Sequence, residues 1–234
     1  MRSFFPRLVL GTLIVGILPI AAQAATTSFG PTAYLQYGDT PADFACAQCE
    51  LKIEDFEDNM LDPFISIDNG MIIPPNYVSG GGVPLTDSVD GDDGSVDGNG
   101  NAGYSWFTGS KRNVTVTFAS VVKSAGLVFT DGDDKSTNFT LEAFDTGGNS
   151  LGLINAGDLA DDNFTGETAE DRFLGFQDMN ASISYITLTM DAGSGIEIDH
   201  IHYQDAASCV PEPGSLSLVL IGMLGLCGLR RRRG

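Results

Sequence analysis

The sequence has few basic residues and only two histidines, and each scarcity excludes a class of protein. Twelve Lys and Arg stand against 31 Asp and Glu, which gives a net charge of −19 in 234 residues. A surface this acidic repels nucleic acid and anionic lipid, so we expect no nucleic-acid partner. His200 and His202 are the only histidines, and no HExxH or P-loop motif occurs. The sequence therefore points away from the common hydrolase and nucleotide-binding classes.

The N-terminus has the three parts of a cleavable signal peptide. Arg2 and Arg7 form a positive region, residues 8–20 form a short apolar run, and Ala22-Gln23-Ala24 is a small-x-small cleavage site. This order predicts removal of residues 1–24 by signal peptidase and export across the inner membrane. The alternative is a permanent anchor, against which the shortness of the apolar run argues.

The segment between the two ends is more acidic than the whole chain. Residues 25–210 hold 30 of the acidic residues and six of the basic ones, a net charge near −24. Such a charge attracts divalent cations or serves only to keep the protein soluble.

Short β-rich runs separated by turn residues fill the middle of the chain. In Val114-Thr115-Val116-Thr117-Phe118 the apolar residues fall on every second position, which is typical of a strand with one buried face. After a loose lead-in at 25–50, residues 51–208 are predicted to form an all-β, antiparallel two-sheet β-sandwich. Residues 79–102 and 155–171 are predicted loops. The predicted strands are 51–56, 64–67, 103–107, 113–119, 125–130, 138–145, 149–154, 172–177, 183–190 and 196–203.

The C-terminus is a second addressing segment, at 210–234. Pro211-Glu212-Pro213 is an extended segment that a protease can hold, and an apolar run at 216–229 follows. A helix over 215–229 rises only ~22 Å, so it is a short transmembrane helix. The chain then ends in a cluster of arginines, which holds this end in the cytoplasm and leaves the body outside. The cluster comprises Arg230, Arg231, Arg232 and Arg233.

This tripartite tail resembles the PEP-CTERM sorting signal. The resemblance covers about the last 25 residues and implies that an exosortase in the inner membrane recognises Pro211-Glu212-Pro213 and cuts near it. It implies a protein of a Gram-negative bacterium that is anchored transiently and then placed on the cell surface or in an extracellular matrix rich in polysaccharide. An anchor that is never cut is the alternative.

The predicted sandwich is similar, more loosely, to carbohydrate-binding jelly rolls. The resemblance rests on Phe56-Glu57-Asp58 and on the stretches at 166–173 and 196–201. It implies a Ca²⁺ ion that bridges the first and last strands, held by Asp55 or Glu57 and by Asp199. Ile196 and Ile198 lie at even positions, whereas Ile201 and Tyr203 lie at odd ones. This switch predicts a bulge near Asp199 or His200 that directs a ligating side chain.

An acidic loop offers a second calcium hypothesis. Hard oxygen ligands suit Ca²⁺, and this loop carries many of them. An EF-hand is excluded because Ala102 replaces its turn glycine and Thr108 stands where a glutamate is needed. A looser site and a merely solvated loop stay open as alternatives. The candidate ligands are Asp90, Asp92, Asp93, Asp97 and Asn99.

Cysteine is sparse, with Cys227 in the apolar tail and three others in the exported segment. An odd number permits one internal bridge, either between Cys46 and Cys49 or from one of them to Cys209. Trp106, the single tryptophan, is expected in the core rather than on a sugar-binding surface.

Together these features predict a non-catalytic surface or matrix protein that binds extracellular polysaccharide, Ca²⁺ or both. A secreted polysaccharide hydrolase and a structural coat component without a ligand are the alternatives.

Overall fold

The computed structural model describes residues 26–47, 49–78, 86–89, 103–132, 137–160 and 168–208. These residues form eleven strands and two short 3₁₀ turns, η1 (Tyr37–Asp39) and η2 (Ala206–Ser208), and every strand pair is antiparallel. The predicted all-β class is confirmed. The strands are β1 (Thr27–Ala33), β2 (Lys52–Glu54), β3 (Ile65–Asp68), β4 (Met71–Ile73), β5 (Ser105–Phe107), β6 (Asn113–Gly132), β7 (Asn138–Phe144), β8 (Ser150–Asp158), β9 (Arg172–Gln177), β10 (Ile183–Met190) and β11 (Ile196–Asp205).

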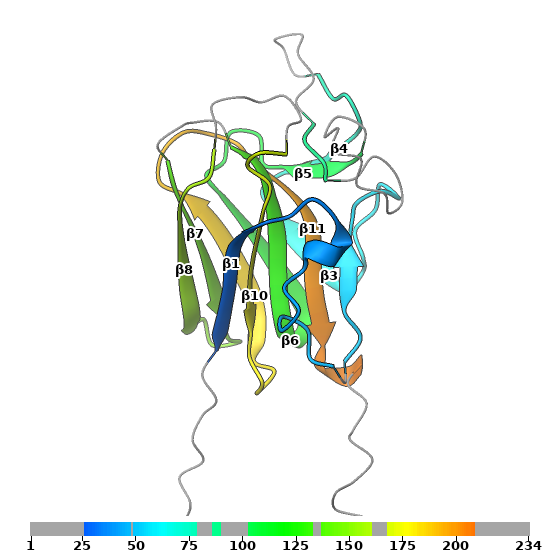
Figure 1. The fold of residues 1–234 in the computed structure, drawn as a ribbon, viewed down its shortest axis with the longest axis vertical. Helices are drawn as coiled ribbons and strands as arrows, with labels where there is room; N and C mark the ends of the chain where they lie inside the picture. The colour runs from blue at the N-terminus through cyan, green and yellow to red at the C-terminus, as the bar shows by residue number, and fades with distance from the viewer. Residues whose placement is uncertain are drawn as a thin grey trace, which may run out of the picture.

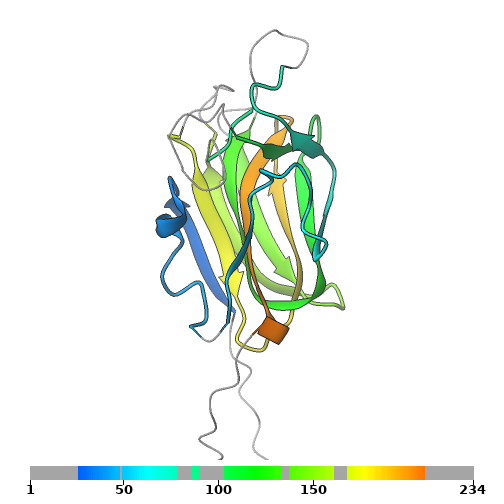
Figure 2. The same ribbon diagram turned by 90° about the vertical axis from the view of Figure 1, so that its right-hand side faces the viewer.

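Strand β6 belongs to both layers of the sandwich. Its first part, up to Phe118, pairs with β3 and β10, and β10 continues to β7 and β8. From Ser124 onward it pairs with β9 and β11, to which β1, β2 and β5 are joined. Figure 2 shows the two layers facing each other. The sequence predicted two strands at 113–119 and 125–130, whereas the structure has one bent strand that links the hydrogen bonding of both layers.

The main core lies between the layers and follows the predicted alternation. Val114, Val116 and Phe118 of β6 are buried there, while Thr117 between them is exposed. Ile186 and Leu188 of β10 point into the same core. Trp106 packs in it against Phe56, which confirms the core assignment of the tryptophan.

A second, smaller core covers the outer face of the β9–β6–β11 layer. It consists of Tyr34, Phe44, Val89, Val128 and Phe173. Two glycines make room for its rings: a Cβ on Gly126 would lie 2.8 Å from Cζ of Phe173, and one on Gly175 would lie 2.8 Å from Cε2 of Phe44. Because the main core covers its inner face and the second core covers its outer face, the second part of β6 is buried on both faces.

The lead-in at 25–50 supplies much of this second core, contrary to the prediction of a loose segment. It contains β1, which pairs with β9, and residues that follow β1 lie over the second layer (Figure 1). The amide side chain of Gln204 binds backbone groups of Cys46 and Cys49 at 2.7–3.1 Å. These contacts, between residues far apart in the sequence, order the segment. Local periodicity in the sequence cannot predict them.

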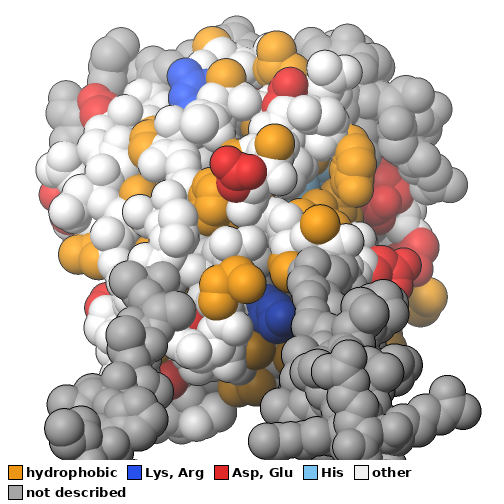
Figure 3. Space-filling view, turned by 60° about the horizontal axis from the view of Figure 1, so that its bottom comes forward, with side chains coloured by type: hydrophobic (Ala, Val, Ile, Leu, Met, Phe, Trp, Pro, Cys, Tyr) orange, Lys and Arg blue, Asp and Glu red, His pale blue; other side chains and the backbone are white. Residues whose placement is uncertain are grey.

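Both ends of the described domain lie at one pole. β1 begins and β11 ends at the bottom of Figure 1, and residues 131–132 and 196–197 lie at the opposite pole. Figure 3 shows the pole at which β1 begins and β11 ends, where uncharged side chains predominate and acidic ones are scattered among them. The predicted signal peptide and sorting tail lie outside the described residues. Within the described part of the chain, no helix has the length and hydropathy to cross a membrane.

Candidate functional site

A bulge in β11 places its acidic residues on the outer side of the second layer. The pairing with β6 shifts register between Asp199 and His202, and His200 has a φ of 39°. The bulge brings Ile198 and Ile201, which differ in parity, into the same core. The predicted bulge is therefore confirmed, and Glu197 and Asp199 are turned toward a segment that we call the strap, residues 86–89.

The strap is fixed by the two carboxylates of β11. Glu197 Oε1 accepts a hydrogen bond from the backbone nitrogen of Asp87 at 2.6 Å and one from the hydroxyl group of Ser105. Asp199 Oδ2 accepts from Ser88 Oγ at 3.0 Å and from the backbone nitrogen of Val89 at 2.9 Å. The strap is thereby held against the end of the sandwich that is far from the termini.

Six carboxylates of the described residues converge at this end and form what we call the acidic cluster. They come from the strap, the end of β6, the residues before β9 and the start of β11, and none is more than 7% exposed. The members are Asp87, Asp131, Glu170, Asp171, Glu197 and Asp199.

Burial and mutual repulsion disfavour the ionised forms of this cluster. Desolvation, followed by the charge of Asp171, raises the pKa of Asp87 to about 11. Desolvation and then the charge of Glu170 raise the pKa of Asp171 to about 8, although Arg172 opposes the shift. Desolvation also raises the pKa of Glu197 well above its ordinary value. All four carboxylate oxygens of Asp87 and Asp171 lack a hydrogen-bond partner.

Of the predicted calcium ligands that the structure describes, Asp199 alone is in the acidic cluster. Glu57 Oε1 accepts from the backbone nitrogen of Tyr104 at 2.5 Å, and Asp55 Oδ1 accepts from that of Glu57 at 3.2 Å. A bridge from either to Asp199 stays a prediction. As the side chains stand, the described residues contain no group of three or more His, Cys, Asp or Glu arranged to hold a metal ion. The loop candidates Asp90, Asp92, Asp93, Asp97 and Asn99 lie outside the described residues.

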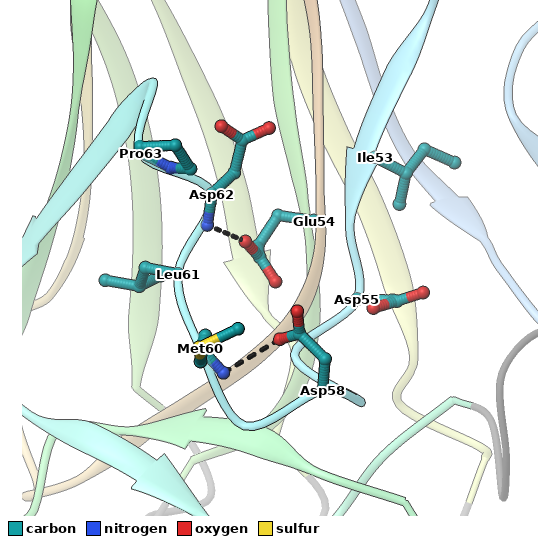
Figure 4. A pocket seen from close by; sticks show the side chains of 8 residues that line it. All are labelled: Ile53, Glu54, Asp55, Asp58, Met60, Leu61, Asp62 and Pro63. Atoms are coloured by element: carbon teal, nitrogen blue, oxygen red, sulfur yellow. Dashed lines mark hydrogen bonds between the residues drawn. The ribbon is translucent and has the colours of Figure 1, made fainter.

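An acidic pocket beside β2 is the other concentration of carboxylates (Figure 4). Glu54 accepts from the backbone nitrogens of Phe56 at 2.8 Å and Asp62 at 2.5 Å, and burial raises its pKa. Asp62 in turn accepts from the hydroxyl group of Tyr203 at 2.5 Å. These acids clamp the 55–62 loop. The lining comprises Ile53, Glu54, Asp55, Asp58, Met60, Leu61, Asp62 and Pro63.

Groups for nucleophilic catalysis are not assembled in the described part of the chain. His200 and His202 are buried beside the hydroxyl group of Tyr34, in the second core. Residues 148–152 match the GxSxG pattern, yet Ser150 begins β8 after a hairpin turn. A nucleophile elbow requires a strand-to-helix turn, which this segment lacks.

The cysteine pair is not bridged to itself. Cys49 is disulfide-bonded, and Cys46 is a thiol. A bridge from Cys49 to Cys209, which lies outside the described residues, stays a prediction.

Five members of the acidic cluster were not predicted as ligands, because they are far apart in the sequence. Asp131 follows the mostly apolar run at 125–130 and Glu197 lies between two buried isoleucines, and these neighbours are the signals that mark both as buried. Asp87, Glu170 and Asp171 lie in stretches whose composition reads as solvated loop.

No protein-family model matches the sequence, and no curated protein matches it. Solved structures with partial likeness include TmCBM61 in complex with β-1,4-galactotriose (TM-score 0.36, 14% identity), which covers 64% of this chain and 94% of that one. A GH87 α-1,3-glucanase catalytic domain has a TM-score of 0.36 and 15% identity over 70% of this chain and 29% of its own. A family 89 glycoside hydrolase from Clostridium perfringens has a TM-score of 0.31 and 12% identity over 63% and 15%. This chain thus spans less than a third of either hydrolase structure, and scores at this level carry no argument about fold or function.

Proposed function

We propose that this chain is an exported, non-catalytic surface or matrix protein that is sorted by its tail and associates with extracellular polysaccharide. The observation that carries the sorting part is that β1 begins and β11 ends at the same pole (Figure 1). The described chain therefore begins at residue 26 and ends at residue 208 at the same pole. Signal peptidase and an exosortase are the processing partners, and a domain tethered there presents its opposite pole, with the acidic cluster, away from the inner membrane.

The outer face of the first layer supplies a surface for polysaccharide. The rings of Phe144 and Tyr185 stack across β7 and β10 with centroids 4.7 Å apart and planes 13° apart. Their chain neighbours Ala143 and Ile186 point into the core, so the rings lie on the outer face. Stacked rings flanked by polar side chains suit the apolar face of a sugar. The flanking residues are Thr140, Glu142, Thr187 and Thr189.

A hydrolase of extracellular polysaccharide and a coat component without a ligand remain the competing functions. The carboxylates of the acidic pocket engage backbone groups of their own loop, an arrangement that supports a structural role. Reducing-sugar release from purified polysaccharide by the protein would identify a hydrolase, and failure to co-sediment with any polysaccharide would favour the coat component.

The sorting part is tested with Glu212→Gln in a Gram-negative host that carries an exosortase. We expect the variant to accumulate in the membrane fraction, whereas the wild type reaches the surface or the medium. Glu50→Gln, at an exposed glutamate of the domain, is the matched control and is released like the wild type. Equal release of all three proteins would contradict the proposal.

A further inference from the structure

When ionised, the six carboxylates of the acidic cluster would carry more negative charge than the described residues compensate. Its members act on one another electrostatically, and Arg172 is the cation whose charge acts on Asp171. The guanidinium group of Arg172 donates its hydrogen bond to the backbone oxygen of Asp171, at 2.7 Å, rather than to a carboxylate. Buried charges are normally paired or coordinate a metal, so this group calls for a counter-ion.

Asp87 and Asp171 are the members for which this need is sharpest. Asp87 is 1% exposed, Asp171 is 0% exposed, and none of their carboxylate oxygens accepts a hydrogen bond. A buried polar group without a partner costs about 1–3 kcal/mol, and more when the group is charged. Such groups are rare in folded proteins, and an ion is one of the accepted reasons for them.

The other carboxylates of the cluster are already engaged in part. Glu197 and Asp199 hold the strap, and Asp131 Oδ1 accepts from the backbone nitrogen of Gly132 at 2.5 Å. Asp87 belongs to the strap itself, and Asp171 is tied through its backbone oxygen to the nitrogen of Tyr34 at 3.2 Å. The backbone that carries Asp87 is therefore held by β11, and the backbone that carries Asp171 is held by the lead-in.

We propose that Asp87 and Asp171 are the core of a Ca²⁺ site at the pole far from the termini. The donors are carboxylate oxygens, which suit a hard cation and not zinc or copper. Ca²⁺ tolerates irregular geometry and completes its shell with backbone oxygens and water. The remaining carboxylates of the acidic cluster make the electrostatic potential at the site more negative, which favours a cation. The site would thus consist of two carboxylates with water, and the described residues contain no group of three or more His, Cys, Asp or Glu arranged to hold a metal ion.

The ion has a structural role in this account. It would tie the strap to the residues before β9, and Val89 of the strap and Tyr34 next to Asp171 both belong to the second core. Binding would therefore stabilise the second core together with the strap. This inference does not depend on the sorting proposal, since it concerns the folded domain alone.

The test is a thermal melt of the exported protein, freed of metal with EDTA and dialysed, with and without CaCl₂ at pH 7.5. At a calcium concentration about 100 times the dissociation constant, we expect the wild-type Tm to rise by about 5–10 °C. NaCl at equal ionic strength controls for screening. A shift that NaCl reproduces, or no shift, would overturn the proposal.

Two variants locate the site. Asp87→Asn combined with Asp171→Asn removes the unpartnered carboxyl groups, so we expect the variant to melt at or above the wild type in EDTA and to lose the calcium shift. Asp43→Asn, at an exposed aspartate of the lead-in, keeps the shift. Retention of the full shift by the double variant would refute the assignment. Should the double variant fail to fold, calorimetric titration of the wild type decides: about one Ca²⁺ per chain supports the site, and no binding refutes it.

Discussion

The hydroxyl oxygen of Tyr34 lies 2.9 Å from Nδ1 of His200, across 166 positions of the sequence. The same oxygen lies 3.3 Å from Nε2 of His202. One side chain of the lead-in thus satisfies ring nitrogens of two residues that β11 buries. These contacts explain why a segment without periodic pattern is a fixed part of the fold.

Tyr34→Phe tests this polar contact while keeping the ring. Loss of the hydroxyl group leaves buried imidazole nitrogens without a partner, which we expect to cost about 1–3 kcal/mol of unfolding free energy. At about 2–4 °C per kcal/mol, the Tm falls by several degrees. Tyr37→Phe removes a hydroxyl group from an exposed tyrosine nearby and should leave the Tm unchanged. Equal melting of Tyr34→Phe and the wild type would show that the contact contributes nothing.

The burial of His202 predicts a loss of stability on acidification. Desolvation, then the charge of His200, lowers its pKa well below the ordinary 6.5. The unfolded chain therefore takes up the proton first, and stability falls as the pH drops below about 6.5, by up to about 1.4 kcal/mol per pH unit. The groups that face the ring are Tyr34, Thr40, Phe44, Phe173 and His200, none of them a carboxylate.

Urea unfolding at pH 7.5, 6.5 and 5.5 isolates this term when wild type and His202→Gln are compared. Acidic groups elsewhere titrate in both proteins, so the difference between them reports the imidazole. We expect the wild type to lose about 1 kcal/mol more than the variant between pH 6.5 and 5.5. Parallel pH profiles would mean that His202 is protonated as readily in the fold as in the unfolded chain.

The stacked rings on the outer face give the polysaccharide hypothesis a specific test. Phe144→Ala combined with Tyr185→Ala removes both rings without touching the core, and we expect about a tenfold loss of affinity in co-sedimentation, which corresponds to about 1.4 kcal/mol. Tyr37→Ala, which removes an exposed tyrosine from a different part of the surface, is the control. Unchanged binding of the double variant would move the sugar site elsewhere.

The disulfide assignment is checked by alkylation and peptide mapping. Before reduction, iodoacetamide should modify Cys46 and leave Cys49 unmodified, because Cys49 is disulfide-bonded. Cys49→Ser should cost about 2–4 kcal/mol, while Cys46→Ser should cost much less. A tryptic peptide with Cys46 bonded to Cys49 would contradict the structure.

The positions of most strands could be predicted from the local sequence pattern, whereas the pairing of the strands could not. The alternation in 113–119 and 183–190 predicted β6 and β10, because a strand with one solvent-exposed face carries apolar residues at every second position. The same rule failed for Met71–Ile73, whose three residues are too few to show a period. The same rule predicted two strands where β6 is one, because buried and exposed residues do not alternate regularly between Phe118 and Ser124.

The acidic cluster illustrates what a single sequence cannot reveal. Asp87 and Asp171 stand 84 positions apart, in stretches rich in acidic and turn residues, where a solvated loop is the expected structure. They are buried because the strap binds the bulged part of β11 and the lead-in covers the strap. Asp199 was predicted as a ligand from the resemblance to carbohydrate-binding jelly rolls, whereas the bulge beside it was predicted from the residue pattern of its own strand, since a bulge leaves a local signature.

The central claim is that the last two dozen residues are a temporary anchor, and the intact mass of the protein recovered from the cell surface or medium tests it most directly. The account predicts a chain that begins after Ala24 and ends near Pro211-Glu212-Pro213, without the apolar run and its arginines. A mature protein whose mass still includes Arg230, Arg231, Arg232 and Arg233 would contradict it.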